Sequence, residues 1–244
     1  MMARFDQCAH RYANYAFVQE LMAEWLSEWL DGVSCPEGTA LEYGAGEGLF
    51  TKHILNHFRR VWAVDQAPHM IELGRDRVPL GDWMEGDAWQ ADGPVECADA
   101  ILSSSLLQWC EDPETVLRRW MKRLRPGGQL LHGFYVSPTL PELSSLLGDS
   151  VMPVRWHSAE AWEDAFAAVG FTIERSECQT RKIGFKGGLE LLRHLHGIGA
   201  INPGRVGAGR LRSVLRRYDD EFRSGDDRVF SSWTFCRIQA RLKQ

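Results

Sequence analysis

The chain has 244 residues, of which 44% are hydrophobic and 25% are charged, a composition typical of a globular protein and not of a disordered one. This length fits one large α/β domain, or one domain with an added cap. The net charge of −5 at pH 7 argues against general binding to nucleic acid, whose phosphates select basic surfaces. No nucleic-acid partner is therefore expected.

Cysteine usage and hydropathy indicate the compartment in which the protein is expected. Six cysteines are scattered without a C-x-x-C pair, which indicates reduced thiols and not a disulfide framework or a zinc site. The N-terminal segment lacks an apolar leader, and no run reaches the roughly 18 apolar residues that a membrane span needs. We expect a cytoplasmic protein without a membrane partner. His53 and His57 have the spacing of a two-histidine metal site, but no third ligand lies near them in sequence, and no metal is predicted.

The first predicted element is an amphipathic helix. Apolar residues recur at three- and four-residue spacing between Val18 and Leu30, and Gly32 then ends the helix. Further along the chain, short apolar runs alternate with helical patterns. The predicted strands are 39–43, 60–65, 83–85, 98–104, 129–135, one that begins at 171, and 231–242. The predicted helices are 48–58, 68–77, 113–124, and 159–169 after the N-cap residue Ser158.

Alternating strands and helices predict an α/β fold, a seven-stranded, mostly parallel, Rossmann-like sheet with helices on both faces. The last strand lacks a crossover helix directly before it, and about fifty residues with helical patterns of their own separate it from the sixth strand. We expect a single domain over residues 1–244. In it, the N-terminal helical segment 1–32 and an insertion at about 186–226 form a helical cap over the mouth of the sheet.

The sequence LEYGAGEG (41–48) places three glycines directly after the first predicted strand. A glycine-rich turn there lets a ligand approach the backbone closely, with N–H groups directed at it. The dinucleotide fingerprint G-x-G-x-x-G has its third glycine in the sixth position, whereas here it stands in the fifth. The stretch resembles instead motif I of class I S-adenosylmethionine-dependent methyltransferases, in which the turn holds the methionine part of the cofactor.

Two further features agree with that resemblance. Asp65 ends the second predicted strand, where a carboxylate offers acceptor oxygens to both ribose hydroxyls; an aspartate that starts the next helix is the alternative. GDAW (86–89) resembles the family element that flanks the adenine. The resemblance implies S-adenosyl-L-methionine as cofactor and S-adenosyl-L-homocysteine as product. The cofactor-binding residues that it implies are Glu42, Gly44, Ala45, Gly46, Gly48, Asp65, Gln66, Asp87, Ala88 and Ser103.

Segments outside these motifs resemble a narrower family, the malonyl-[acyl-carrier-protein] O-methyltransferases of biotin synthesis. They are FDQCAHRYANYA (5–16), LLQWCEDP (106–113), TLPELSSL (139–146) and LLRHLHGIGAINPGR (191–205). The resemblance implies methylation of the free carboxylate of a malonyl thioester, with an acyl carrier protein as partner. The alternatives are a methyltransferase of a free small carboxylic acid or quinone precursor, and a non-catalytic protein that binds the cofactor.

Methyl transfer to a carboxylate requires residues that position and desolvate the substrate. A carboxylate is already ionised near pH 7, so no general base is needed, and catalysis consists of positioning and desolvation. Arg155 is the predicted clamp for the substrate carboxylate, with a surface arginine as the alternative. Tyr12 is predicted to close over the sulfonium, with packing of the N-terminal segment as the alternative. Gln108 is predicted to donate a hydrogen bond to the substrate.

Basic residues exceed acidic ones between Arg175 and Arg217. This excess suits an acidic carrier protein that docks at the mouth of the site, and a solvated helix face is the alternative. His194 and His196 are expected on this basic cap.

Overall fold

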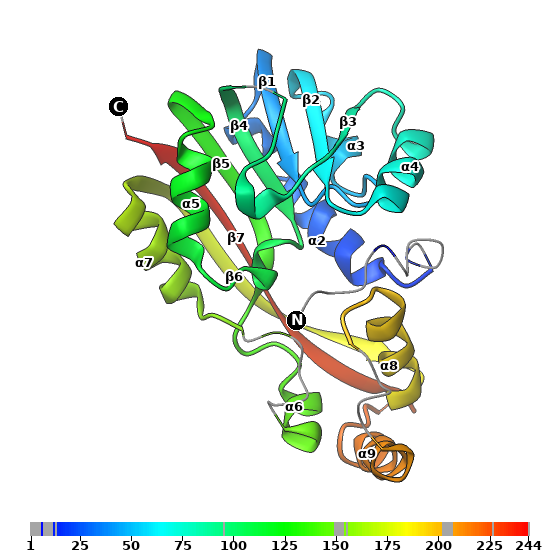
Figure 1. Cartoon of the computed structure of the whole chain (residues 1–244). Helices are drawn as coiled ribbons and strands as arrows, with labels where there is room; N and C mark the ends of the chain where they lie inside the picture. The colour runs from blue at the N-terminus through cyan, green and yellow to red at the C-terminus, as the bar shows by residue number, and fades with distance from the viewer. Residues whose placement is uncertain are drawn as a thin grey trace.

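The computed structural model describes residues 6, 12, 14–94, 96–148, 154, 156–201, 207–225 and 227–243, and a seven-stranded sheet forms its centre (Figure 1). The strands are β1 (Cys35–Tyr43), β2 (Phe58–Asp65), β3 (Asp82–Glu85), β4 (Ala98–Ser104), β5 (Leu124–Val136), β6 (Phe171–Phe185) and β7 (Val229–Leu242). Their order is β3-β2-β1-β4-β5-β7-β6. The first five strands pair in parallel, and β7 is antiparallel to both of its neighbours. The predicted α/β fold with a mostly parallel sheet is confirmed.

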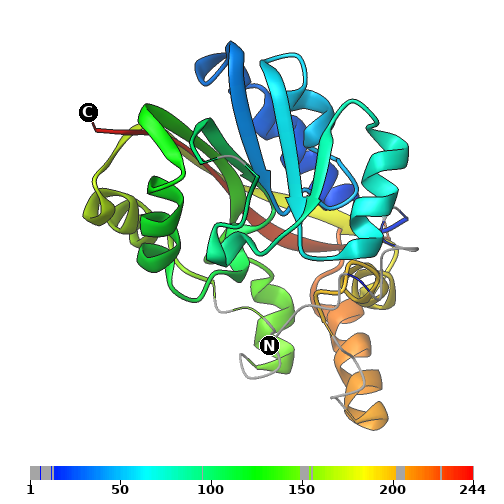
Figure 2. The ribbon, with the colours of Figure 1, turned by 45° about the horizontal axis from the view of Figure 1, so that its top comes forward.

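Helices cover both faces of the sheet (Figures 1 and 2). They are α2 (Phe17–Ser27), α3 (Thr51–Ile54), α4 (Pro68–Arg77), α5 (Pro113–Met121), α6 (Pro141–Leu147), α7 (Ala159–Val169), α8 (Gly188–Gly197) and α9 (Ala208–Glu221). Three short 3₁₀ turns are η1 (Leu30–Gly32), η2 (Ala88–Gln90) and η3 (Leu107–Trp109). Trp120 of α5 and Phe166 of α7 pack on one face, whereas Leu26 of α2 and Ile54 of α3 pack on the other.

The alternation of side chains along β1 explains this two-sided core. Leu41 and Tyr43 belong to the cluster with α5 and α7, and Ala40 belongs to the cluster with α2 and α3, because successive side chains in a strand point to opposite faces. Glu42 is two residues after Ala40 and therefore points to the same face of the sheet, where it contacts Thr51 of α3. The sequence period therefore places an acidic side chain under the turn that follows β1.

The two last strands form a long antiparallel hairpin that carries a second group of helices. β6 and β7 pair continuously from Phe171–Leu242 to Phe185–Val229, apart from one register shift. The end of the hairpin near Phe185 packs against α6, α8 and α9 in one cluster of buried side chains (Leu143, Leu146, Leu191, Leu195, Val214, Tyr218 and Trp233 among them). α2 contributes Val18 and Met22 to the same cluster. In Figure 2, α9 projects from this end of the molecule.

The observed elements differ from the predicted ones mainly in length. The predicted helix 48–58 is wrong in extent, since only Thr51–Ile54 is helical. Gly48 has a left-handed φ of 91°, which no α-helix accommodates, and β2 begins at Phe58 directly after a short turn. β5 begins at Leu124, earlier than predicted, because Leu124 already pairs with Ala98; the pairing then shifts register before Gln129, and Gly127 in this stretch has a left-handed φ of 75°. α6 was not predicted as a helix.

No helix in the described part of the chain is long and apolar enough to cross a membrane. Among the same residues, no group of three or more histidine, cysteine, aspartate and glutamate side chains is arranged to hold a metal ion.

Candidate functional site

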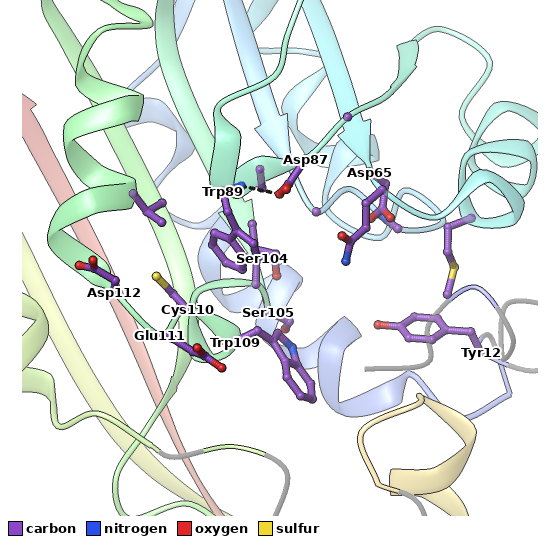
Figure 3. A pocket seen from close by; sticks show the side chains of 18 residues that line it. Tyr12, Asp65, Asp87, Trp89, Ser104, Ser105, Trp109, Cys110, Glu111 and Asp112 are labelled. Carbon is purple, nitrogen blue, oxygen red and sulfur yellow. Dashed lines mark hydrogen bonds between the residues drawn. The ribbon is translucent and has the colours of Figure 1, made fainter. Parts of the chain in front are cut away.

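A cavity of about 390 Å³ lies where the parallel strands end (Figure 3). Gly44 follows β1, Asp65 ends β2, Gly86 follows β3 and Ser104 ends β4, and all four line the cavity. Ligands of open, mostly parallel sheets bind at this edge, and the volume is in the range of small-molecule sites. The lining residues are Tyr12, Gly44, Gly46, Asp65, Gln66, Met70, Gly86, Asp87, Ala88, Trp89, Ser104, Ser105, Leu106, Trp109, Cys110, Glu111, Asp112 and Val116.

The glycine turn has the conformation that its sequence predicts. Gly44 and Gly46 have φ values of 67° and 55°, which L-residues with a side chain rarely adopt. A Cβ atom on Gly44 would meet Leu106 Cδ1 at 2.8 Å, whereas one on Gly46 would meet nothing within 4 Å. The backbone at Gly46 is thus open to the cavity. Gly48 does not line the cavity: a Cβ atom there would meet Val78 Cγ2 at 2.7 Å, so this glycine serves packing.

Asp65 is fixed by backbone donors on both sides. Its Oδ2 accepts from the Gly46 N–H at 2.9 Å, and its Oδ1 accepts from the Ala67 N–H at 2.9 Å. Each carboxylate oxygen has a second lone pair for a ligand hydroxyl. Burial raises the pKa of Asp65, although these backbone N–H bonds act in the opposite sense. The bond to the Ala67 N–H, just before α4, fits the alternative of an aspartate that starts the next helix. Asp65 also lies on the cavity wall, so it can accept hydrogen bonds from a ligand as well.

A small recess adjoins the cavity beneath the glycine turn. It has a volume of about 30 Å³, and Glu42 and Ala45 line it together with Gly44 and Gly46. The Glu42 side chain is buried, and its Oε2 accepts from Thr51 Oγ1 at 2.6 Å. Burial raises the pKa of Glu42 to about 8, an effect to which nearby Asp65 adds and which the Thr51 hydrogen bond opposes.

Three consecutive residues form the wall next to β3. Asp87 Oδ1 accepts from the Trp89 N–H at 2.8 Å and thereby caps η2. The Asp87 N–H donates to Asp92 Oδ2 at 3.1 Å. The Ala88 carbonyl accepts from Trp120 Nε1 at 2.8 Å. These bonds give the backbone of residues 87–89 a fixed shape against the cavity.

The electrostatics of the cavity favour a cationic ligand. Its described lining includes the carboxylates of Asp65, Asp87, Glu111 and Asp112 and no lysine or arginine. Field lines from like charges concentrate in a cleft, so a pyrophosphate is repelled and a sulfonium is attracted. The residues present therefore fit S-adenosylmethionine better than a dinucleotide.

Tyr12 is brought to the cavity from the N-terminal segment. In Figure 3 its ring extends toward the cavity, with the hydroxyl directed inward, on the side of Asp65. Burial, together with the nearby Tyr135, Glu47 and Asp65, raises the pKa of Tyr12 above its usual range, so the phenol is neutral. The ring also packs against Ala67 and Met70. The packing role and the site role coexist at this residue.

Besides Gly48, the predicted site residues Ser103 and Gln108 do not line the cavity or the recess. Ser103 is fully buried and hydrogen-bonds His132 Nδ1 at 2.8 Å, while Ser104 and Ser105 line the cavity in its place. Gln108 Nε2 donates to the Ser105 carbonyl at 2.7 Å, and this bond braces Ser105 in its left-handed conformation (φ 57°). Alternation along β4 accounts for the first displacement.

The remaining predictions for single residues fare differently. The predicted carboxylate clamp, Arg155, lies outside the described residues. His194 is not on a basic surface as expected: it is buried on α8 against Phe17, Phe185 and Trp233, and burial lowers its pKa to about 4. Trp109, Glu111 and Met70 line the cavity but were not among the predicted site residues, because only the folded chain brings η3 and α4 to the glycine turn.

The fold, the glycine turn and the acidic cavity are those of a class I S-adenosylmethionine-dependent methyltransferase domain. Residues 41–132 match a family described as a methyltransferase domain, and such a domain implies use of S-adenosylmethionine.

Relatives of known name cover most of the chain. The malonyl-[acyl-carrier protein] O-methyltransferase of Halorhodospira halophila is 29% identical over 92% of this chain and 81% of that protein. The protein of the same name from Serratia marcescens is 29% identical over 88% of this chain and 86% of its own length. Among solved structures, an S-adenosylmethionine-dependent methyltransferase from Mesorhizobium loti matches with a TM-score of 0.56 and 17% identity, over 90% of this chain and 97% of the other.

Proposed function

We propose that this enzyme transfers the methyl group of S-adenosylmethionine to the free carboxylate of a malonyl thioester on an acyl carrier protein, a step in the synthesis of a biotin precursor. The main support for this proposal is that similarity to the malonyl-[acyl-carrier protein] O-methyltransferases spans about nine-tenths of the chain, far beyond the matched domain at 41–132. The resembling segments at 139–146 and 191–205 overlap most of α6 and α8, whose buried residues share one cluster.

We infer a cofactor site built on the glycine turn. Asp65 would accept hydrogen bonds from the ribose hydroxyls, and the backbone of Asp87 and Ala88 would flank the adenine beside Trp89. Gly46 would leave space for the cofactor chain. When bound, the cofactor supplies a methyl group on a sulfonium, an electrophile that a carboxylate oxygen attacks directly. The neutral Tyr12 ring would cover the sulfonium and exclude water.

The acidic cavity sets a requirement for the substrate. Because its described lining carries four carboxylates, an incoming malonyl carboxylate is repelled unless a cation holds it. We propose that Arg155 provides this clamp. Its neighbour Trp156 is half-buried and packs against the cluster that joins α6, α8 and the end of the β6–β7 hairpin.

We further propose that segment 1–32 and the insertion at about 186–226 form a cap within a single domain, and that the cap receives the carrier protein. On α9, a shallow surface hollow is lined by Arg212, Arg216 and Arg217 together with Gly209 and Ser213. Acyl carrier proteins are acidic, so an arginine-rich helix would steer their approach.

Product identification tests the reaction. The purified enzyme is incubated with methyl-labelled S-adenosylmethionine and malonyl-, succinyl- or glutaryl-carrier protein, and the acyl chain is analysed by mass spectrometry after release. The proposal predicts a methyl ester on the malonyl chain and much less on the longer ones. Methylation of free malonate or of a quinone precursor in preference to the carrier-bound acid would overturn it.

A further inference from the structure

Two cysteines face each other across the last two strands of the sheet. Cys178 of β6 is directly opposite Cys236 of β7 in the antiparallel register, and opposite residues of such a pair direct their side chains to the same face. Cys236 belongs to the core cluster that includes residues of α7, so both thiols lie on the face where α7 packs beside β6 (Figure 1). Neither thiol lines the cavity.

The backbone pairing brings these two thiols close together. The next pair on the same face is Thr180 and Thr234, whose hydroxyl oxygens lie 3.0 Å apart. The Thr234 N–H donates to Thr139, in the segment that follows β5, and therefore points away from β6. By alternation the Cys236 N–H also points away, so Cys178 and Cys236 form a non-hydrogen-bonded pair, whose Cα atoms are about 4.5 Å apart. A disulfide spans Cα distances of about 4.4–6.8 Å.

The two thiols differ in exposure and in acidity. Cys178 is exposed, whereas Cys236 is fully buried. A hydrogen bond from the Cys236 thiol lowers the pKa of Cys178, although burial and the carboxylates of Glu163 and Glu160 oppose this change. The same contact, together with burial, raises the pKa of Cys236 above its usual range. An accessible thiol of lowered pKa beside a second thiol is the arrangement of redox-sensitive cysteines.

The surrounding charge bears on which oxidant can react. Carboxylates beside Cys178 repel an anionic disulfide such as oxidised glutathione, but they do not repel neutral hydrogen peroxide. We propose that Cys178 and Cys236 are a peroxide-reactive pair that forms a cross-strand disulfide. This inference is independent of the proposed methyl acceptor.

The reaction has two steps. The Cys178 thiolate attacks one oxygen of hydrogen peroxide, the O–O bond breaks, hydroxide leaves, and Cys178 becomes a sulfenic acid. The Cys236 sulfur then attacks Cys178 Sγ, the S–O bond breaks, and the second hydroxide leaves. The protons of the two thiols convert both hydroxides to water, so two thiols and one peroxide give one disulfide and two waters.

The bond would fasten the base of the insertion that carries α8 and α9, because both helices lie between residues 178 and 236. Closing so long a loop restricts the unfolded chain and thereby stabilises the fold. The oxidised protein should therefore unfold at a temperature higher by about 5 °C or more, and a reductant should reverse the change.

Peptide mapping tests for the bond. The full chain is treated with hydrogen peroxide, its remaining thiols are blocked by alkylation, and it is digested with trypsin without reductant. Cleavage after arginine releases peptides 176–181 and 229–237. We expect mass spectrometry to show them as one linked species, lighter than their sum by two hydrogen atoms, which a reductant separates. In Cys236→Ala, dimedone should label the sulfenic acid at Cys178.

Cys178→Ser is the decisive variant, because Cys178 is exposed and its replacement should fold normally. It should abolish both the linked species and the rise in unfolding temperature. Cys97, which is exposed just before β4, is the internal control and should oxidise more slowly. Three outcomes overturn the inference: no linked species at a peroxide concentration that oxidises Cys97, a link that forms only in urea, or a rise in unfolding temperature that persists in Cys178→Ser.

Discussion

At the scale of single residues, the site depends on carboxylates held in place by backbone N–H groups. Asp65 is bonded to Gly46 and Ala67 before any ligand arrives, so its oxygens are already oriented toward the cavity. Preorganised acceptors of this kind spare the ligand the entropic cost of fixing a side chain. The glycine turn and Asp65 therefore act as one unit.

Replacing Asp65 tests this unit. Asp65→Asn keeps the shape but removes the charge and one acceptor, and we expect S-adenosylhomocysteine to bind about tenfold or more weakly, since hydrogen bonds to charged groups contribute about 1.5–3 kcal/mol. Isothermal titration calorimetry measures the affinity. Asp82→Asn, at an exposed aspartate that pairs with Arg60, is the control and should bind normally. Wild-type affinity in Asp65→Asn would remove the residue from the site.

Glu42 predicts a pH dependence of stability. Its usual pKa of 4.5 rises to about 8 in the fold, mainly because the carboxyl is buried, with Thr51 opposing and Asp65 adding to the rise. The native state then holds a proton that the unfolded state has released, so the free energy of unfolding falls as pH rises from about 5 to 8, by up to about 1.4 kcal/mol per pH unit.

Glu42→Gln should flatten this profile, because the amide does not titrate. Urea unfolding of the ligand-free protein at several pH values measures it, and Glu24→Gln, an exposed residue of α2, should keep the wild-type slope. Parallel profiles for Glu42→Gln and the wild type would show that Glu42 is ionised in the native state at neutral pH.

At the scale of elements, α2 is fastened to the sheet by one buried cation. The Arg237 guanidinium of β7 lies 4.1 Å and 4.2 Å from the ring centroids of Trp25 and Trp29. It also pairs with Glu28 of α2 at 2.9 Å and with Glu177 of β6 at 2.7 Å, and it is itself only 5% exposed. The two carboxylates are 62% and 45% exposed, so the cation stabilises the fold mainly through its contacts with the indole rings and its hydrogen bonds.

Arg237→Ala should therefore lower the free energy of unfolding by about 2–3 kcal/mol, through lost hydrogen bonds and ring contacts, measured by urea denaturation. Arg241→Ala is the matched control on the same strand. Its exposed ion pair with Glu174 should contribute no more than about 1 kcal/mol. Equal effects of the two substitutions would mean that the Trp25–Arg237–Trp29 stack does not hold α2.

Comparison of the elements with the sequence shows which features are local. The glycine turn, Asp65 and the Asp87–Ala88 wall follow from spacing along neighbouring strands, and the structure places all of them at one cavity. Met70 and Glu111 could not be predicted, since their positions at the cavity depend on α4 and the segment after η3 lying near the glycine turn, a long-range arrangement. Ser103 was placed one residue away from the lining serines, because a motif match does not fix the strand face.

At the scale of the whole molecule, a methyltransferase sheet is joined to a second group of helices, in which α6, α8 and α9 pack with α2 at the end of the β6–β7 hairpin. If α9 receives the carrier protein, the double variant Arg212→Glu, Arg216→Glu should raise the KM for malonyl-carrier protein roughly tenfold at low salt, because steering charges act mainly on encounter. Steady-state kinetics should show little change for the malonyl ester of coenzyme A.

Arg59→Glu, Arg60→Glu provides the control for the same change in net charge. Both arginines are exposed at the start of β2, away from the edge where the strands end at the cavity. An unchanged KM for the α9 variant, or an equal rise in the control, would place the docking surface elsewhere.

We propose that this enzyme esterifies the free carboxylate of a carrier-bound malonyl group, and methyl transfer to that group can be measured directly. The most direct measurement is kcat/KM for methyl transfer to malonyl-carrier protein, beside malonyl-coenzyme A and free malonate under the same conditions. We expect the highest kcat/KM for the carrier-bound substrate and the lowest for free malonate. Equal values for all three acids, or no methyl ester on the carrier-bound one, would contradict it.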